Sequence, residues 1–285
     1  MEIIRNPHHM QQHAAGLKAD GVAIGFAPTM GALHQGHLAL LDMLKGKCDL
    51  RVMSIFVNPA QFGPQEDYDA YPRQFERDCG MAQAGGCDVL FAPDRESMYP
   101  RPFYTDVTVA TITEGLCGAA RPGHFAGVAT VVAKLFNIVM PRVAVFGQKD
   151  AQQAIVIKRM VTDLHFPVTL LIAPIVREAD GLAMSSRNAY LSDRERAEVA
   201  LINQGLQRAA TLFEHGERTA RALISAMHEV YAGARIFTVE YSEIVDTIHV
   251  QPVDQLEGPA LIAVACRTNE TNTRLIDNCL IGGEI

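Results

Sequence analysis

The sequence predicts an α/β protein in which a parallel-sheet domain is followed by a smaller α+β domain. Short apolar runs alternate with amphipathic stretches over the first two thirds of the chain, which is typical of strands joined by helices. After about residue 176 a polar loop leads into charged helical stretches and alternating strands. The length of 285 residues suits one domain of about 170–180 residues plus a smaller one. We therefore expect domains over 1–175 and 176–285.

Five apolar runs in the first domain have the character of buried strands, because they are brief and end at Gly, Pro or Asp. They cover residues 22–27, 50–57, 89–92, 143–146 and 168–173. The segments 37–47 and 150–164 between them have helical spacing. Strands that are apolar on both sides and joined by helices indicate a parallel sheet covered on both faces. Ligands in such sheets bind beyond the carboxyl ends of the strands.

The second domain is expected to combine helices with an antiparallel sheet. Ser192 and Glu195 have the spacing of a capping box, which predicts the start of a helix. A second helix is expected near 219–232, and strands are expected at 237–241 and 260–265.

Composition limits the classes of function. A net charge of −7 argues against a nucleic-acid partner or an anionic membrane, since both require a basic face. The N-terminal residues lack the apolar core of a signal peptide, and no apolar run is long enough to span a membrane. The six cysteines show no CxxC spacing. We expect a cytoplasmic protein with reduced thiols and neither a disulfide framework nor a zinc site.

The motif PTMGALHQGH, at 28–37, follows the first strong strand and precedes a helix. Gly31 and Gly36 allow close approach of a ligand, and His34 and His37 can project to one side at the helix N-terminus. Such a place suits anionic phosphates, to which two imidazoles can donate hydrogen bonds. The alternatives are a pair of surface histidines at a turn or a metal-binding pair. The position between strand and helix favours the phosphate site.

Three further motifs follow predicted strand ends or the loop that joins the domains. Asn58 and Gln61 carry neutral groups that can donate and accept, which suits the hydroxyls and carboxylate of a small substrate, although Asn-Pro is often only a turn. In GQKDAQQ, Lys149 offers a point charge for phosphate and Gln153 faces the same side as Asp150, whose alternative role is helix capping.

The fourth motif, MSSRN at 184–188, offers two hydroxyls and a guanidinium to phosphate. Its alternative is a solvated loop. Because three of the four motifs favour phosphate, their agreement predicts a nucleotide site more strongly than any one of them.

Taken together, the motifs resemble those of the pantoate–β-alanine ligase family. The resemblance runs from about residue 3 to the C-terminal TRLIDN and rests on PTMGALHQGH, SIFVNPAQF, YPR, EGLCGAARPGHFAGVATVVAKLFNIV, FGQKDAQQ, MSSRN and TRLIDN in this order. HxGH and SSR alone would indicate only the wider nucleotidyltransferase superfamily, which includes class I aminoacyl-tRNA synthetases.

The resemblance implies a Rossmann-like first domain, a C-terminal lid domain and a homodimer. It also implies that ATP, (R)-pantoate and β-alanine are converted to AMP, pyrophosphate and (R)-pantothenate with Mg²⁺. His37 would be the proton-donating catalytic histidine, assisted by His34, Lys149 and Arg187. Gln61 would bind pantoate and β-alanine, Gln153 pantoate, and Asp78 is the candidate Mg²⁺ ligand. The implied ATP-binding residues are Met30, Gly31, Ala32, Leu33, His34, Gln35, Gly36, His37, Gly147, Gln148, Lys149, Asp150, Val176, Met184, Ser185, Ser186 and Arg187.

The chain departs from the family pattern at two places. Ala126 stands where arginine is common, which removes a positive charge near Arg121 and His124. The segment 266–272 is longer than expected and is predicted to lengthen a hairpin.

The expected reaction has two steps, through a pantoyl-adenylate and without a protein nucleophile. One rival hypothesis is a nucleotidyltransferase that stops at a nucleotidyl product, against which VNPAQF and GQKDAQQ argue. Another is a catalytically silent nucleotide-binding regulator, against which the intact histidine, lysine and SSR motifs argue.

Overall fold

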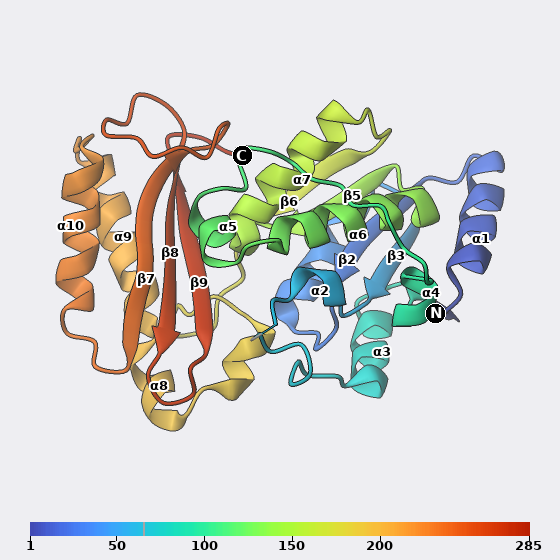
Figure 1. Ribbon diagram of the computed structural model, residues 1–285, viewed down its shortest axis with the longest axis horizontal. Coiled ribbons are helices and arrows are strands. Elements are labelled where there is room, and N and C mark those ends of the chain that lie inside the picture. Colours follow the sequence, from blue (N-terminus) through green and yellow to red (C-terminus); the bar gives the residue numbers. More distant parts are fainter. Residues whose placement is uncertain (65) are drawn as a thin grey trace. The chain divides into compact units, whose positions relative to one another are not determined.

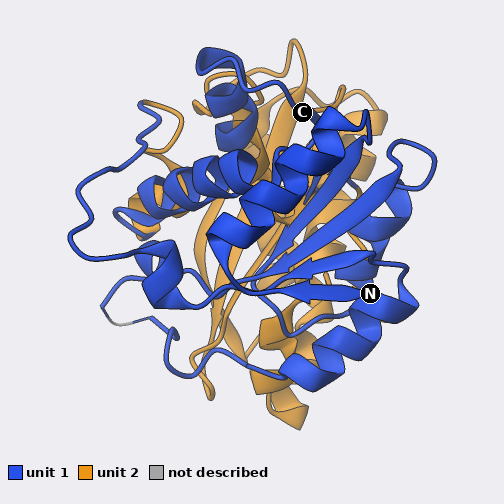
Figure 2. Ribbon diagram, turned by 90° about the vertical axis from the view of Figure 1, so that its right-hand side faces the viewer, with its two compact units in different colours: residues 1–110, 121–147, 156–173 blue, residues 111–120, 148–155, 174–285 orange. Residues whose placement is uncertain are grey.

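The computed structural model describes residues 1–64 and 66–285, which form two compact units (Figure 2). Unit 1 consists of Met1–Ala110, Arg121–Gly147 and Val156–Ala173. Unit 2 consists of Thr111–Ala120, Gln148–Ile155 and Pro174–Ile285. Two short segments from the first two thirds of the sequence therefore belong to the same unit as the C-terminal part.

Unit 1 contains a six-stranded parallel sheet with the order β1-β4-β3-β2-β5-β6. Its strands are β1 (Glu2–Ile4), β2 (Ile24–Thr29), β3 (Leu50–Ile55), β4 (Val89–Phe91), β5 (Val143–Gly147) and β6 (Thr169–Ala173). The predicted α/β class is confirmed, and each of the five expected strands overlaps an observed one. Strand β1 was not predicted, because three residues are too few to show a pattern.

Both faces of this sheet are buried, since successive residues along the strands pack into two different hydrophobic cores. In β2, Phe26 packs in one core and Ala27 in the other, and in β3 Val52 and Met53 divide in the same way. The first core includes residues of α1 (Pro7–Ala19), α6 (His124–Val139) and the later part of α7 (Ala151–Asp163). The second includes residues of α2 (Gln35–Met43) and α3 (Phe75–Ala84). The shorter elements η1 (Pro59–Gln61) and α4 (Arg95–Met98) lie in the connections.

The strand order places a topological switch point between β2 and β5. From β2 the chain continues to β3 and β4 on one side, whereas β5 and β6 lie on the other side. Parallel pairing of Gly25 with Val143 brings the carboxyl ends of β2 and β5 to the same edge of the sheet. Ligands of open α/β sheets bind at this point. The motifs that follow these strands therefore begin where the fold favours a ligand.

Unit 2 is built on the antiparallel sheet β7-β8-β9, with α9 and α10 packed along it (Figure 1). Its other elements are α5, η2, the first turns of α7, η3 and α8. The bounds are α5 (Leu116–Ala120), η2 (Gln148–Asp150), η3 (Ser186–Tyr190), α8 (Asp193–Glu198), α9 (Ala200–Glu214), α10 (Ala220–Tyr231), β7 (Phe237–Asp246), β8 (Ala260–Thr268) and β9 (Arg274–Ile281). In the described residues of both units, no helix is long and apolar enough to cross a membrane.

The predicted capping box at Ser192 and Glu195 is confirmed, and Glu195 has a second role that the sequence did not show. Its fully buried carboxylate also accepts hydrogen bonds from the backbone N–H of Glu270 at 3.0 Å and of Thr271 at 2.9 Å. Burial raises the pKa of Glu195, but hydrogen bonds from Thr271 and Ser192 outweigh it and lower the pKa to about 2. Glu195 thereby ties the β8–β9 connection to the start of α8.

Replacing Glu195 by Gln should lower the free energy of unfolding by about 2 kcal/mol at pH 7, because an amide cannot accept from all of these donors. Since the folded-state pKa lies below the ordinary 4.5, the ionised carboxylate stabilises the fold above about pH 4.5 and loses this effect toward about pH 2. Urea unfolding between pH 3 and 8 should show the difference shrinking below about pH 4.5. E257Q, at an exposed position, is the control. A difference that stays constant with pH would contradict this account.

Candidate active site

The side chains of His34 and His37 form a capping box at the start of α2, in which each ring accepts a hydrogen bond from a backbone N–H of the motif. His34 is the N-cap, and its Nδ1 accepts a hydrogen bond from the N–H of Gly36 at 3.2 Å. Nδ1 of His37 accepts from the N–H of His34, also at 3.2 Å. Because each Nδ1 accepts, each neutral ring carries its proton on Nε2. The motif thus sets two Nε2–H donors, with ring centroids 4.0 Å apart, at the positive end of a helix.

The loop before these histidines is held by Asp78 from α3. Gly31 and Ala32 both adopt positive φ angles, of 84° and 49°. The two oxygens of the buried Asp78 carboxylate accept hydrogen bonds from the N–H groups of Ala32 and Leu33, each at 2.8 Å. Asp78 therefore stabilises a strained turn through two charge-assisted hydrogen bonds. Across the described residues no group of three or more His, Cys, Asp or Glu could hold a metal ion, and the Mg²⁺ role of Asp78 stays a prediction.

Asn58 and Gln61, which follow β3, lie next to Met30, which follows β2. Asn58 is 1% exposed and donates to Gln61 Oε1 at 3.1 Å and to the Gly127 carbonyl at 3.0 Å. Its own oxygen accepts from the hydroxyl of Tyr99 at 2.8 Å. Gln61 Nε2 lies 3.0 Å from Met30 Sδ. The polar atoms of Asn58 are engaged within the protein, so its expected substrate contact stays a prediction, and the structure supports a role for Asn58 in orienting Gln61.

The main chain of Gln61 is held by a charged cluster that the sequence did not connect with it. Its carbonyl accepts from His124 Nδ1 at 2.8 Å and from Arg121 Nη2 at 3.1 Å. Arg121 also makes a bidentate pair with Glu66, at 2.6 Å for both contacts. Burial raises the pKa of Glu66, but Arg121 more than offsets this and the pKa is lowered. The RPGH sequence, which places Arg and His three residues apart at a helix start, was the available signal.

Gln35 is the first residue of α2 in unit 1, and Gly147 ends β5 in the same unit, whereas the predicted site residues from Gln148 onward lie in unit 2. Lys149 Nζ is 3.9 Å from Asp150 Oδ1. The two glutamines that follow differ in their surroundings. Gln152 is buried and bonds to Cys117, Ile112 and Gly115, whereas the half-buried Gln153 side chain has no hydrogen bond within the described chain. This difference supports Gln153 as the ligand-binding member of the pair.

The segment 176–187 of unit 2 forms a closed turn. The N–H of Met184 donates to the Val176 carbonyl at 2.9 Å, and Arg177 and Ala183 form a β-bridge. Ser185 Oγ accepts from the N–H of Arg187 at 3.3 Å and so caps η3, in which Ser186 is the first residue. Val176, Met184 and the SSR motif are thereby joined in one local structure.

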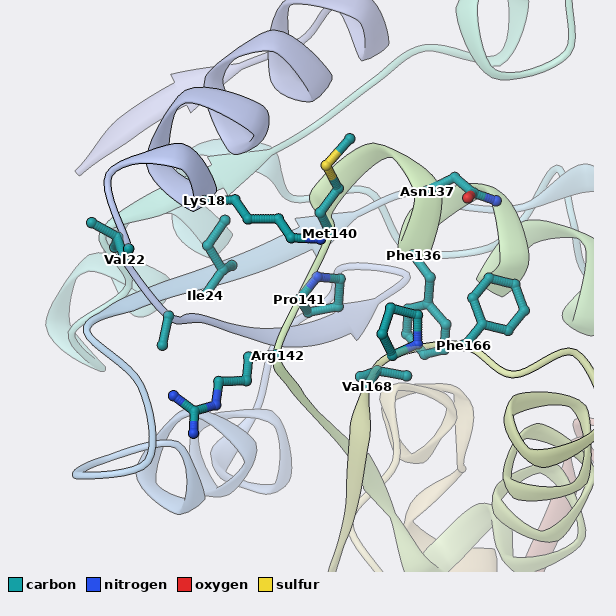
Figure 3. Close-up of a pocket in the computed structure, with 13 residues that line it drawn as sticks. Lys18, Val22, Ile24, Phe136, Asn137, Met140, Pro141, Arg142, Phe166 and Val168 are labelled. Carbon is teal, nitrogen blue, oxygen red and sulfur yellow. The ribbon is translucent and has the colours of Figure 1, made fainter.

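Unit 1 also contains a cavity of about 490 Å³ (Figure 3). It is lined mainly by apolar side chains, such as Ile24, Phe136 and Phe166, together with Lys18 and Arg142. These residues lie at the amino ends of β2, β5 and β6 and at the C-terminal ends of α1 and α6. Helix C-termini present carbonyl oxygens, which disfavour phosphate. The cavity therefore does not belong to the candidate active site.

The sequence matches the family model of pantoate-beta-alanine ligase over residues 2–280. The chain belongs to this family. It is 50% identical to a pantothenate synthetase of Heliobacterium modesticaldum over 99% of each chain, and 47% identical to that of Geobacter sulfurreducens over 100% of each. The crystal structure of pantothenate synthetase from Thermus thermophilus is similar with a TM-score of 0.92 at 42% identity, covering 98% of this chain and 99% of that one.

A more distant family member is similar in the form of a complex with ligands. The pantoate-beta-alanine ligase of Francisella tularensis, complexed with beta-gamma ATP and beta-alanine, matches with a TM-score of 0.80 at 31% identity. The match covers 98% of this chain and 97% of that one.

Replacing Gly127 by Ala should disturb Gln61, because α6 passes very close to η1. A Cβ at Gly127 would lie 2.2 Å from the carbonyl oxygen of Ala60 and 2.7 Å from the nitrogen of Gln61. We expect a loss of about 1–3 kcal/mol in the free energy of unfolding, measured in urea. Gly16→Ala in α1 is the matched control, since its Cβ would meet nothing within 4 Å and should be neutral or stabilising. Equal stability of the two variants would refute the close approach.

Proposed function

We propose that this protein joins (R)-pantoate to β-alanine at the expense of ATP, through a pantoyl-adenylate, releasing AMP and pyrophosphate. The observation that carries the proposal is the reciprocal capping of His34 and His37, which sets two Nε2–H donors at the start of α2. Membership of the ligase family and the ATP and β-alanine of the Francisella tularensis complex support it.

In the first step, a carboxylate oxygen of pantoate attacks the α-phosphorus, and the bond to the bridging oxygen breaks. Its electron pair leaves with pyrophosphate, where negative charge accumulates. His34 and His37 donate Nε2–H hydrogen bonds to this charge, and His37 is the one to which the family resemblance gives the catalytic, proton-donating role. By the family resemblance, Lys149, Ser186 and Arg187 would supply the other phosphate donors. Stabilisation of charge on the leaving group is the main contribution a protein makes to this chemistry.

Mg²⁺ belongs to this proposal as the partner of ATP. It neutralises charge on the phosphates when it is bound, and it takes few protein ligands because it keeps several waters. Asp78 is the candidate protein carboxylate. Each of its oxygens already accepts from one backbone amide and the side chain is 1% exposed, so the assignment of Asp78 to Mg²⁺ is supported by the family resemblance alone.

Gln61 and Gln153 are proposed to recognise pantoate, with Asn58 orienting Gln61. Their amides can donate to the carboxylate and accept from the hydroxyls at once. In the second step, the amine nitrogen of β-alanine, held near Gln61, attacks the acyl carbon. The bond to the adenylate oxygen breaks, AMP leaves with the electron pair, and the amine loses a proton.

The remaining ATP contacts are assigned by family resemblance. They are Met30, Gly31, Ala32, Leu33, Gln35, Gly36, Gly147, Gln148, Asp150, Val176, Met184 and Ser185. We further propose a cytoplasmic homodimer in which the C-terminal domain acts as a lid.

The test is pyrophosphate exchange into ATP. Exchange should depend on pantoate and Mg²⁺ and proceed without β-alanine, and adding β-alanine should yield pantothenate. Exchange that required β-alanine would overturn the adenylate step. A stable nucleotidyl product would indicate the simple transferase, and ATP binding with no AMP release would indicate a regulator.

Replacing His37 should separate its catalytic role from its capping role. His37→Ala removes both, whereas His37→Gln keeps an N3 acceptor for the His34 N–H but moves the donor. We expect turnover to fall by about 10²–10³ in both variants, the scale of one lost oxyanion donor. Thermal unfolding should show a clear loss only for Ala, and His228→Ala on the exposed side of α10 is the control. Normal turnover of His37→Gln would remove His37 from the catalytic set.

The adjacent glutamines of α7 offer a matched pair of substitutions. Gln153→Ala should raise the KM for pantoate by about tenfold or more with little change in stability, because it removes a substrate hydrogen bond. Gln152→Ala should lower the free energy of unfolding by about 1–3 kcal/mol, because it leaves buried partners unsatisfied. Steady-state kinetics and urea unfolding of both variants check this. The reverse assignment of effects would contradict it.

A further inference from the structure

Asn278 of β9 is a buried polar residue that holds the main chain around Lys149. It is 4% exposed, and its Nδ2 donates to the carbonyls of Gln148 at 2.9 Å and Lys149 at 3.0 Å. Its Oδ1 accepts from Gln148 Nε2 at 3.2 Å. One amide side chain therefore fixes two successive peptide groups of η2, from which the Lys149 side chain extends.

The preceding residue, Asp277, holds a different segment. It is 3% exposed and makes a bidentate pair with Arg177, at 2.6 and 3.0 Å. Arg177 also donates to the Gly181 carbonyl at 3.0 Å, across the turn that leads to Met184. Asp277 also accepts from the N–H of Asn278 at 2.8 Å. Two adjacent residues of β9 thus hold η2 and the 177–181 turn through hydrogen bonds.

A network continues from this turn to the SSR motif. Glu178 accepts from Asn188 Nδ2 and from Arg196 Nη2, each at 2.6 Å. Asn188 also donates to the Ala183 carbonyl at 3.1 Å. Because Asn188 lies directly after Arg187 in η3, the turn and the SSR motif are fixed to each other.

We propose that Asp277 and Asn278 are positioning residues that hold Lys149 and the 176–187 segment as one preformed phosphate-binding unit. The proposal rests on the function proposed above, and it gives the DN of TRLIDN a role without substrate contact. Lysine is a flexible point charge, so its usefulness to phosphate depends on where its backbone is fixed. Two buried polar residues in a core strand are costly unless fully bonded, and here their partners belong to the segments proposed to bind ATP.

The experiment compares Asn278→Ala with Asn269→Ala. Asn269 donates to the Arg235 carbonyl at 2.9 Å in the same unit and does not contact η2, so it controls for the loss of a hydrogen bond from asparagine to backbone. Pantoate-dependent exchange kinetics, ATP titration by calorimetry and thermal unfolding are measured for both. We expect Asn278→Ala to raise the Kd and KM for ATP by about 10- to 100-fold, as expected for a misplaced binding group, with the KM for pantoate unchanged. Asn269→Ala should leave all three constants unchanged.

Arg177→Lys provides a second route if Asn278→Ala folds poorly. It keeps the charge opposite Asp277 but loses the bidentate fork, and it should raise the KM for ATP in the same selective way. Wild-type affinity for ATP in a folded Asn278→Ala or Arg177→Lys protein would overturn the proposal. So would an equal rise in the KM values for ATP and pantoate, which would indicate a general structural role. If the wild-type protein itself neither binds ATP nor exchanges pyrophosphate, the proposed function fails instead.

Discussion

The buried carboxylate of Asp78 is the constraint on which the geometry of unit 1 depends. The chain must turn sharply between the end of β2 and the start of α2, and it does so through two consecutive residues with positive φ. One of them is Ala32, for which this conformation is costly. Two hydrogen bonds from Asp78 offset that cost and leave His34 at the N-cap. The imidazoles then complete the helix start with their own Nδ1 atoms, so the strained turn, the cap and the orientation of the donors depend on one another.

A similar arrangement holds the amide proposed to recognise the acid. Gln61 is neutral, but its backbone is held by charged groups, through Arg121 and its bidentate partner Glu66. The glycine at 127 lets α6 approach closely enough for its carbonyl to bond Asn58. At the position of Gln61 a cation could not accept from a hydroxyl and a carboxylate would repel the substrate's carboxylate, whereas a neutral amide both donates and accepts. The charged residues Arg121 and Glu66 therefore position Gln61, and the neutral amide of Gln61 is the group proposed to recognise the acid.

The sequence predicted what depends on local pattern. Apolar runs located five strands of the parallel sheet, and the spacing of Ser192 and Glu195 located a helix start. It could not predict partners distant in sequence, such as Asp78 with Ala32 or Glu195 with Thr271. Strand β9 was missed as a strand because Asp277 and Asn278 interrupt its apolar pattern, although both are buried. The sequence selected Gln153 by its position relative to Asp150, but it could not show that the neighbouring Gln152 is bonded within the chain.

The residues whose structural roles the sequence did not show share a physical property, which explains why they matter to the site. Asp78, Asp277 and Asn278 are polar and buried. Asp78 and Asn278 are bonded to the main chain of loops that carry the proposed chemistry, and Asp277 is bonded to Arg177, which spans one of these loops. These loops do place apolar residues such as Leu33 and Leu182 in the cores, but apolar packing has no preferred direction and does not fix the main chain to a fraction of an ångström. Hydrogen bonds from rigid helices and strands do, because they are directional and short. Buried polar groups therefore position the residues that are proposed to bind ATP. These buried groups in turn depend on the loops, because without the loops their hydrogen bonds would be lost.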